Sequence, residues 1–569
     1  MKKFAFIIGM GWMSLSVANA QQDTTLVRTV VVENQYNPTV MDASKINVLP
    51  KVEEPTVPKA HIDYASSIRP VSAWNYQAMQ PIVKEWNADA ASRGYLRAGY
   101  GNEGNVDAAL GYLWDISKKD RLNVAASLNG WNGDLNGWNW QAKDWNGEEW
   151  NSRMYNTKVG LDYSHAFKKV DFLLGGDYHS RVFNYMTPRF FDGHKDPSMN
   201  GYYDKQHQTF ANAYIGFAST DKDMPVQFEV QAGFRYYDEK YPKHDYDSDI
   251  MDTETNVFVM GNVWKNLTKE RGLGIGLNFD NYSQSNDWID RVMAIELNPY
   301  YSMQNDTWKV RLGAHLDWVG REDEHGNCDK LYLSPDVNVE YLFSDSYVLY
   351  AKVGGGRGFS SFYELMDIAP YLIVRNLAPT YMTLDAALGL KASPADGWWF
   401  NVSGGYQIRE NDVCLYTRTG SGFDMDNEVG DTKVFYGTAE LKHDYKDLWD
   451  FSLKATYYHW DWDGEINEGG SYNAQKERAL SLKPELEIIG EVGFKPMDGL
   501  RVNGGCEFVK RAEDIHEPIS NLYLGADYTL MKNLNIFAKV NNLLNKEYVT
   551  ISSFPAQKLN FMAGLSLQF

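Results

Sequence analysis

The dominant feature of this sequence is a strict alternation of apolar and polar residues, which recurs from residue 93 to the C-terminus. The residues at 308–318, 398–408 and 449–457 all follow this pattern. In a further run, apolar residues alternate with Gln227, Glu229, Gln231, Gly233 and Arg235; they are Val226, Phe228, Val230, Ala232, Phe234 and Tyr236. A period of two places alternate side chains on opposite faces of a β-strand. Each run therefore predicts a strand with one apolar and one polar face.

Two all-β folds fit this alternation. In a soluble sandwich the apolar face packs inside, whereas in a membrane barrel it faces lipid and the polar face lines the lumen. Many of the runs hold the alternation for nine to thirteen residues, while soluble strands are usually about five or six residues and tilted membrane strands about nine to eleven. The mean hydropathy is −0.47, and outside the extreme N-terminus no apolar run is long enough for a membrane helix. Strand length therefore favours a transmembrane barrel.

The linkers between the predicted strands alternate between short and long. The short ones are residues 118–120, 220–223, 304–306, 343–346, 394–397 and 445–447, and the long ones lie near 133–150, 187–203, 238–250, 321–330, 363–380, 411–431 and 461–477. Outer-membrane barrels have short turns on the periplasmic side and long loops outside. Several tryptophans near strand ends, namely Trp308, Trp318, Trp398, Trp449 and Trp460, are typical of aromatic belts at the lipid interfaces. We predict an antiparallel transmembrane β-barrel of about 22 strands over residues 93–569.

The N-terminus has a different composition. Residues 1–20 combine Lys2 and Lys3 with an apolar stretch and an Ala-Asn-Ala end, the pattern of a cleaved signal peptide. Residues 21–92 carry prolines at 38, 50, 55, 58, 70 and 81, which disfavour long helices and central strands. We therefore expect an extended periplasmic segment over 21–92, with one β-prone run at 29–33.

Charge and motifs exclude several function classes. With 55 basic and 75 acidic residues the formal charge is −20, so nucleic acid is an unfavourable partner. The chain has no nucleophile elbow, zinc-protease motif or phosphate-binding loop, and its three cysteines form no metal or disulfide pattern. We expect no enzyme activity and no catalytic, cofactor or metal site.

Three features are candidate binding elements. Trp138, Trp140 and Trp145 lie in a tryptophan-rich loop that is suited to stacking on sugars or apolar ligands, although an interfacial girdle is the favoured interpretation. On the predicted polar faces, the candidate lumen-lining residues are Arg235, Arg311, Asp317 and Lys454, with simple solvation and cross-wall pairing as the alternative. The loop at 354–380 is apolar and is expected to fold inward, pack on a partner or cap the barrel.

Two regions resemble the barrels of TonB-dependent receptors. The strands are rich in Asn, Trp and Tyr, which is similar to members of that family from Bacteroidota. The residues that carry this resemblance are Gly356-Arg357-Gly358-Phe359, Glu364-Leu365, Asn376-Leu377-Ala378-Pro379, the run 540–548 and the last strand from Asn560 to Phe569. The resemblance implies a location in the Gram-negative outer membrane among lipid and lipopolysaccharide. It also implies uptake of a ligand, with TonB or another envelope protein as partner.

The chain departs from that family at its N-terminus. Family members carry a plug of about 130 residues, whereas only residues 21–92 are available here. Thr29, Val30, Val31 and Val32 resemble a TonB box or the first strand of a plug. We therefore expect a receptor or transporter for an unidentified ligand that lacks a full plug. A structural or accessory barrel of an outer-membrane complex and a passive porin are the alternatives.

Overall fold

A computed structural model describes residues 93–569 with internal gaps. The gaps are residues 140–143, 186–204, 222, 241–242, 246–247, 251–252, 286–288, 324–325, 359–360, 374–377, 418–424, 447, 465–471 and 552–553. The predicted signal peptide and the segment 21–92 lie outside the described residues. Among the described residues, no helix combines the length and apolarity needed to cross a bilayer.

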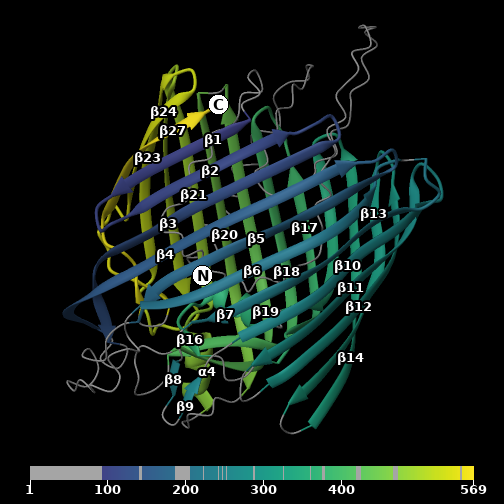
Figure 1. The fold of residues 1–569 in the computed structure, drawn as a ribbon, viewed down its shortest axis with the longest axis horizontal. Coiled ribbons are helices and arrows are strands. Elements are labelled where there is room, and N and C mark those ends of the chain that lie inside the picture. Colours follow the sequence, from purple (N-terminus) through teal and green to yellow (C-terminus); the bar gives the residue numbers. More distant parts are fainter. Residues whose placement is uncertain are drawn as a thin grey trace, which may run out of the picture.

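The described residues form one closed antiparallel barrel of 22 strands (Figure 1). The strands are β1 (Gly94–Gly101), β2 (Val106–Asp115), β3 (Asp120–Asn139), β4 (Asp144–Ala166), β5 (Val170–Asn184), β6 (Lys205–Ser219), β7 (Gln227–Glu239), β10 (Thr253–Asn266), β11 (Arg271–Ser285), β12 (Ile289–Gln304), β13 (Trp308–Asp323), β14 (Gly326–Ser344), β15 (Tyr347–Arg357), β17 (Tyr381–Ala392), β18 (Trp398–Thr417), β19 (Met425–Tyr445), β20 (Trp449–Gly464), β21 (Pro484–Met497), β22 (Leu500–Arg511), β23 (Ile519–Met531), β24 (Leu534–Asn541) and β27 (Asn560–Gln568).

The barrel closes where its first and last strands meet. β1 pairs with β27 in antiparallel register, from Tyr95 opposite Gln568 to Gly101 opposite Met562. At the end of this seam the backbone N–H of Gly94 donates to the carbonyl oxygen of Phe569 at 2.8 Å. Because the number of strands is even, the last strand ends at the same rim at which β1 begins. The prediction of an antiparallel barrel of about 22 strands is confirmed.

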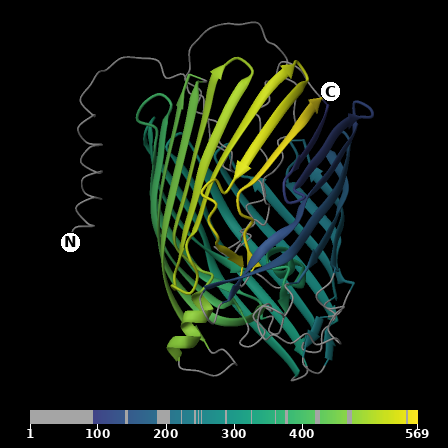
Figure 2. The ribbon, with the colours of Figure 1, turned by 90° about the vertical axis from the view of Figure 1, so that its left-hand side faces the viewer.

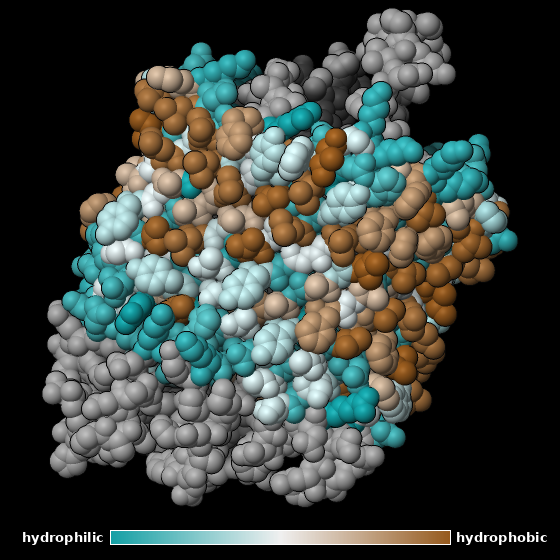
Figure 3. Space-filling model, in the orientation of Figure 1, coloured by the Kyte–Doolittle hydropathy of each residue, from teal (hydrophilic) through white to brown (hydrophobic). Residues whose placement is uncertain are grey.

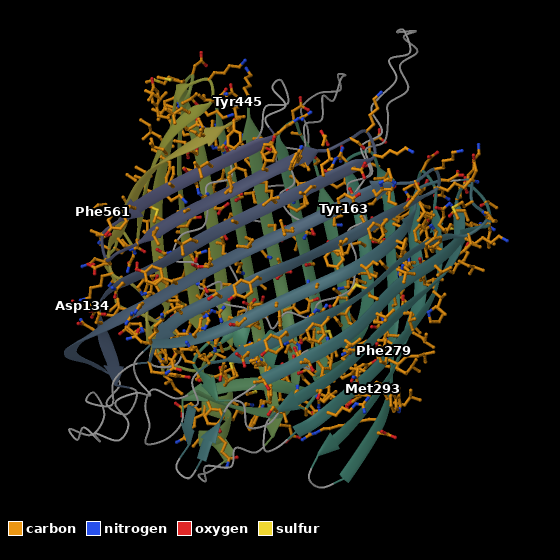
Figure 4. All side chains as sticks on the ribbon, viewed as in Figure 1. Asp134, Tyr163, Phe279, Met293, Tyr445 and Phe561 are labelled. Carbon is orange, nitrogen blue, oxygen red and sulfur yellow. The ribbon has the colours of Figure 1, made fainter. Side chains whose placement is uncertain are left out.

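The long connections all lie at one rim, together with short ones such as those between β1 and β2 and between β13 and β14. The prediction of long linkers near 133–150 and 321–330 is wrong, because β3, β4, β13 and β14 extend through most of both ranges. The C-terminus and the remaining short turns occupy one end, called the turn side below (Figure 1). The other end, the loop side, carries helix α4 (Tyr472–Leu480) and the small ladder of β8 (Lys243–Asp245) with β9 (Ser248–Ile250) (Figures 1 and 2). Tyr163 and Tyr445 mark the turn side and Asp134 the loop side (Figure 4). The longest strands exceed the predicted nine to thirteen residues, because hairpins such as β3–β4 continue their ladder toward the loop side.

Apolar side chains gather on the outer wall, over the upper left and the right of the face in Figure 3. On β13, Leu312 and Leu316 are exposed to the outside, while Asp317, which follows Leu316, is buried on the inner face. The same alternation holds on β19, where Phe435 is 60% exposed and its neighbour Val434 is fully buried. The period-two pattern thus separates an apolar exterior from a largely polar interior.

One tryptophan prediction is wrong. Trp308 and Trp398 are exposed on the outer wall, but Trp460 is buried inside the barrel together with Trp462. On β20 the even-numbered positions face inward, so Trp460 belongs to the inner face. Its indole N–H donates to the carbonyl oxygen of Pro484 at 2.6 Å, which anchors the connection after α4 to the wall.

Candidate functional site

A loop between β15 and β17 covers part of the inner wall at the loop side. We call residues 358–380 the closing loop; it contains helix α3 (Phe362–Ile368) and the short strand β16 (Leu372–Ile373), which pairs with β19. Its apolar side chains are fully or almost fully buried among inward-facing residues of the wall: Phe362, Leu365, Met366, Tyr371 and Leu372. Of the three placements expected for this loop, the structure shows the inward one.

The first turn of α3 is held by a carboxylate on the wall. Glu254 of β10 accepts hydrogen bonds from the backbone N–H of Phe362 at 2.7 Å and of Tyr363 at 3.4 Å. The amide of Gln284 on β11 donates to the same carboxylate at 2.7 Å. The Ser361 hydroxyl caps the helix by accepting from the backbone N–H of Glu364. The first N–H groups of a helix have no partner within the helix, and the Glu254 side chain supplies the acceptor for two of them.

The other end of α3 is held by a guanidinium. Arg181 of β5 donates to the carbonyl oxygens of Met366 at 2.5 Å and Asp367 at 3.1 Å, and to the Asp367 carboxylate at 3.1 Å. On β6, the Gln208 amide donates to the carbonyl oxygen of Pro370 at 3.1 Å. A cation at the carbonyl end of the helix is favoured by the partial negative charge of the carbonyl groups there. Three neighbouring regions of wall therefore bind the main chain of the closing loop.

A second segment meets the closing loop from elsewhere on the ring. We call β25 (Val549–Ile551) and β26 (Phe554–Pro555) the closing hairpin; Arg511 of β22 donates to the carbonyl oxygens of Val549 and Thr550. In the strand order, β22 lies on the opposite side of the ring from β10. The ring of Phe554 stacks on Tyr371, with centroids 3.5 Å apart and planes 6° apart. Burial raises the pKa of the Tyr371 hydroxyl. The two segments together span the loop-side end of the lumen.

The predicted lumen-lining residues lie on inner faces but do not form one site. Arg235 lies over the Phe258 ring at 4.2 Å and 3.8 Å from the Asp280 carboxylate. Arg311 donates to Asp336 at 2.7 Å and to Asn298 at 2.6 Å. Their roles in ion preference stay a prediction.

The other two lumen-lining candidates differ sharply in exposure. Asp317 is buried and accepts a hydrogen bond from the Tyr381 hydroxyl at 3.1 Å. Lys454 lies 3.7 Å from the Glu440 carboxylate, and its side chain is 54% exposed. Lys454 is thus the more accessible of the two charges.

The predicted tryptophan loop is described only in its backbone. Trp138 of β3 lies opposite Trp145 of β4 in the antiparallel register. Trp140 and the predicted TonB-box residues Thr29, Val30, Val31 and Val32 lie outside the described residues. Ligand contact by these residues stays a prediction.

Sequence reasoning missed the wall residues that hold the closing loop. Arg181, Gln208 and Glu254 stand in ordinary alternating strands and carry no motif. The apolar composition of the loop was the one available signal, and it indicated burial without identifying the partner surface.

Comparison with known proteins gives structural neighbours alone. No protein-family model matches the chain, and no curated protein matches it in sequence. The fold is similar to the FrpB iron transporter from Neisseria meningitidis (F3-3 variant), with a TM-score of 0.65 at 10% identity over 85% of this chain and 82% of that one. It is also similar to the copper transporter OprC, with a TM-score of 0.61 at 13% identity over 84% and 80%. A third neighbour is the ferric enterobactin receptor PfeA, with a TM-score of 0.61 at 12% identity over 85% and 82%. At these identities the neighbours show a shared fold.

Proposed function

We propose that this chain is an outer-membrane receptor or transporter of the TonB-dependent kind, which takes up an unidentified ligand across a Gram-negative outer membrane. The observation that carries the proposal is a closed 22-strand barrel with an apolar exterior, whose lumen is crossed at the loop side by the closing loop and the closing hairpin. The structural neighbours, named as iron and copper transporters and a siderophore receptor, support the same class.

The geometry favours a gated passage over a passive porin. A barrel of 22 strands encloses a lumen far wider than the side-chain-filled interior of an eight-strand barrel. Left open, such a lumen passes small solutes freely. The closing loop is fixed to the wall by a carboxylate and a guanidinium, and its apolar residues are buried. Such a fixed closure suits a passage that opens on demand.

The N-terminal segment supplies the second half of the proposal. We propose that residues 21–92 take the place of a full plug at the turn side, and that Thr29–Val32 engage TonB in the periplasm. The basis is the β-prone run at 29–33 within a proline-rich stretch. Outer-membrane lipid and lipopolysaccharide surround the barrel in this arrangement.

Planar-bilayer conductance tests the proposal on three forms of the protein. They are the full chain, a form lacking 21–92, and a form that also has residues 361–373 replaced by a Gly-Ser segment of equal length. We expect the full chain to be nearly silent, the first deletion to show openings interrupted by closure of the loop side, and the double change to conduct most. Equal, large conductance in all three forms identifies a passive porin and refutes the proposal.

TonB engagement is tested separately. We expect the purified periplasmic domain of TonB to bind the full chain, and a Val30→Pro, Val32→Pro double variant to lose that binding because proline prevents strand pairing. Binding that survives the double variant removes Thr29–Val32 from the proposal. If none of the three forms tested in bilayers conducts and the full chain does not bind TonB, the accessory-barrel alternative is favoured.

A further inference from the structure

The closing loop occupies a site on the wall that recognises peptide main chain. We propose that this wall site is the ligand site of the barrel, that the closing loop fills it in cis, and that the ligand is a peptide with aromatic or aliphatic side chains. The inference deepens the proposed function and rests on it. We call the site formed by Arg181, Gln208, Glu254 and Gln284 the wall site.

The polar groups of the wall site contact atoms that every peptide carries. Glu254 accepts from two consecutive backbone N–H groups, those of Phe362 and Tyr363. Arg181 donates to two consecutive backbone carbonyls, those of Met366 and Asp367. Recognition through main-chain atoms does not depend on the sequence of the loop, so another peptide in the same conformation satisfies the same groups.

The closing loop covers the polar groups of the wall site. With the loop in place, Glu254 is 2% exposed, Arg181 5% and Gln208 1%. When the loop leaves, Glu254 and Arg181 exchange its main-chain hydrogen bonds for bonds to water, and a ligand with matching main-chain groups competes with water for them. A replacement must offer N–H donors at one end and carbonyl acceptors at the other. Amide-bonded ligands meet that requirement and hydrocarbons do not.

The side-chain contacts separate peptides from sugars. Tyr363 packs edge-on against Phe210 at 5.2 Å, and Tyr371 packs edge-on against Phe183 at 5.3 Å. Met366 is fully buried in the same cluster. Sugars can stack on aromatic faces, but they lack an apolar side chain that fills the space taken by the fully buried Met366. The wall site therefore selects peptides with large apolar side chains.

Because the closing loop of the same chain occupies the wall site, binding of an external peptide is coupled to opening of the passage. An external peptide binds only when the closing loop has left, so its apparent affinity falls by the fraction of molecules in which the loop is displaced. The loop leaves from the end of β15, where Gly356 has a φ of +123°, a conformation suited to glycine. Its departure also breaks the Tyr371–Phe554 stack and separates the closing loop from the closing hairpin. Ligand binding and opening of the passage are thus one event.

The test uses the loop itself as a free peptide. A fluorescent peptide of the sequence Ser361–Leu372 is titrated into the full chain and into the variant with 361–373 replaced by Gly-Ser, both in detergent micelles. We expect anisotropy to show binding to the replaced variant and at most weak binding to the full chain, whose site is occupied. N-methylation of the peptide at the amides of Phe362 and Tyr363 removes the donors for Glu254, and we expect it to abolish binding.

Two wall variants and a control complete the experiment. In the replaced background, Arg181→Met and Glu254→Met are each expected to weaken peptide binding by about tenfold or more, the effect of losing two hydrogen bonds to the peptide main chain. The control Arg501→Met removes an inward arginine on β22 that pairs with Asp450, and it should leave binding unchanged. Heat-modifiable mobility on gels confirms that each variant is a folded barrel.

The outcomes separate this inference from the proposed function. Failure of the folded, replaced variant to bind the peptide overturns the inference, as does equal binding by the Arg181→Met variant. If the form with 361–373 replaced and 21–92 removed nevertheless conducts ions strongly, the gated passage stands and the peptide site falls. If the replaced variant does not bind the peptide and the form that also lacks 21–92 does not conduct, both fall.

Discussion

The inner wall contains glycines that are covered by tyrosine rings, and one of them allows a sharp test of barrel packing. Gly405 of β18 lies under Tyr436 of β19, whose hydroxyl donates to Asp385 at 3.0 Å. A Cβ at Gly405 would lie 2.5 Å from the Tyr436 hydroxyl oxygen and 2.7 Å from the carbonyl oxygen of Ala386. The same pairing recurs round the barrel at Gly111 with Tyr95, Gly175 with Tyr214, Gly274 with Tyr300, Gly389 with Tyr350 and Gly505 with Tyr523.

We expect Gly405→Ala to lower the free energy of unfolding by about 2 to 4 kcal/mol. Overpacking costs about 1–3 kcal/mol, and displacing the ring breaks a hydrogen bond worth about 1 kcal/mol. The backbone carbonyl cannot move without disturbing the ladder to β17, so relaxation is limited. The adjacent Gly404 is the matched control, because a Cβ there has its nearest neighbour, the carbonyl oxygen of Tyr436, at 3.7 Å. Gly404→Ala should be neutral or stabilise by about 0.5–1 kcal/mol, since alanine restricts the unfolded chain.

Urea unfolding in lipid vesicles, followed by tryptophan fluorescence, measures both variants against the unchanged chain. We expect the midpoint to fall for Gly405→Ala and to stay or rise for Gly404→Ala. A difference of about 3 kcal/mol corresponds to a change of more than a hundredfold in the folding equilibrium. Equal midpoints for the two variants would refute the ring-over-glycine packing, because the substitutions differ only in the face that they occupy.

Three further perturbations address the loops and the lumen. Phe554→Ala removes the stack on Tyr371, which is worth about 0.5–1.5 kcal/mol. In single-channel records of the form lacking 21–92, the ratio of open to closed time should therefore rise by roughly two- to tenfold. An unchanged ratio contradicts the closing role of this contact. Asp412→Asn removes the buried carboxylate that lies 2.9 Å from the Lys483 ammonium and leaves that charge with neutral acceptors such as the Val413 carbonyl oxygen. It should destabilise by about 3–5 kcal/mol, measured as faster trypsin cleavage after α4; equal cleavage rates count against this anchor. Lys454→Glu should shift the reversal potential of the form lacking 21–92 toward cation preference, and an unmoved potential removes Lys454 from the conducting path.

The barrel itself was predictable because the rules that produce it are local. A strand between lipid and water must alternate apolar and polar side chains, and that period is visible within any ten residues. The side of each connection likewise follows from the order of the chain, and every connection at the turn side is short, as predicted. The predicted loop lengths near 133–150 and 321–330 were too long, because the strands there extend past the bilayer-spanning length. Trp460 shows which local signal prevails: its place near a strand end indicated an interface, but its even position on β20 put it inside, as the period of two requires.

The closure of the lumen was decided by tertiary structure. The sequence showed that 354–380 is too apolar for a solvated loop, and no more. Its partners stand far away along the chain, with Arg181 185 residues before Met366 and Glu254 108 residues before Phe362. Distant strands become neighbours across a lumen only when the sheet closes on itself, and the diameter and register of that closure determine which inward residues the loop can reach. Face preference is a property of each strand, whereas a contact across the lumen is a property of the whole ring.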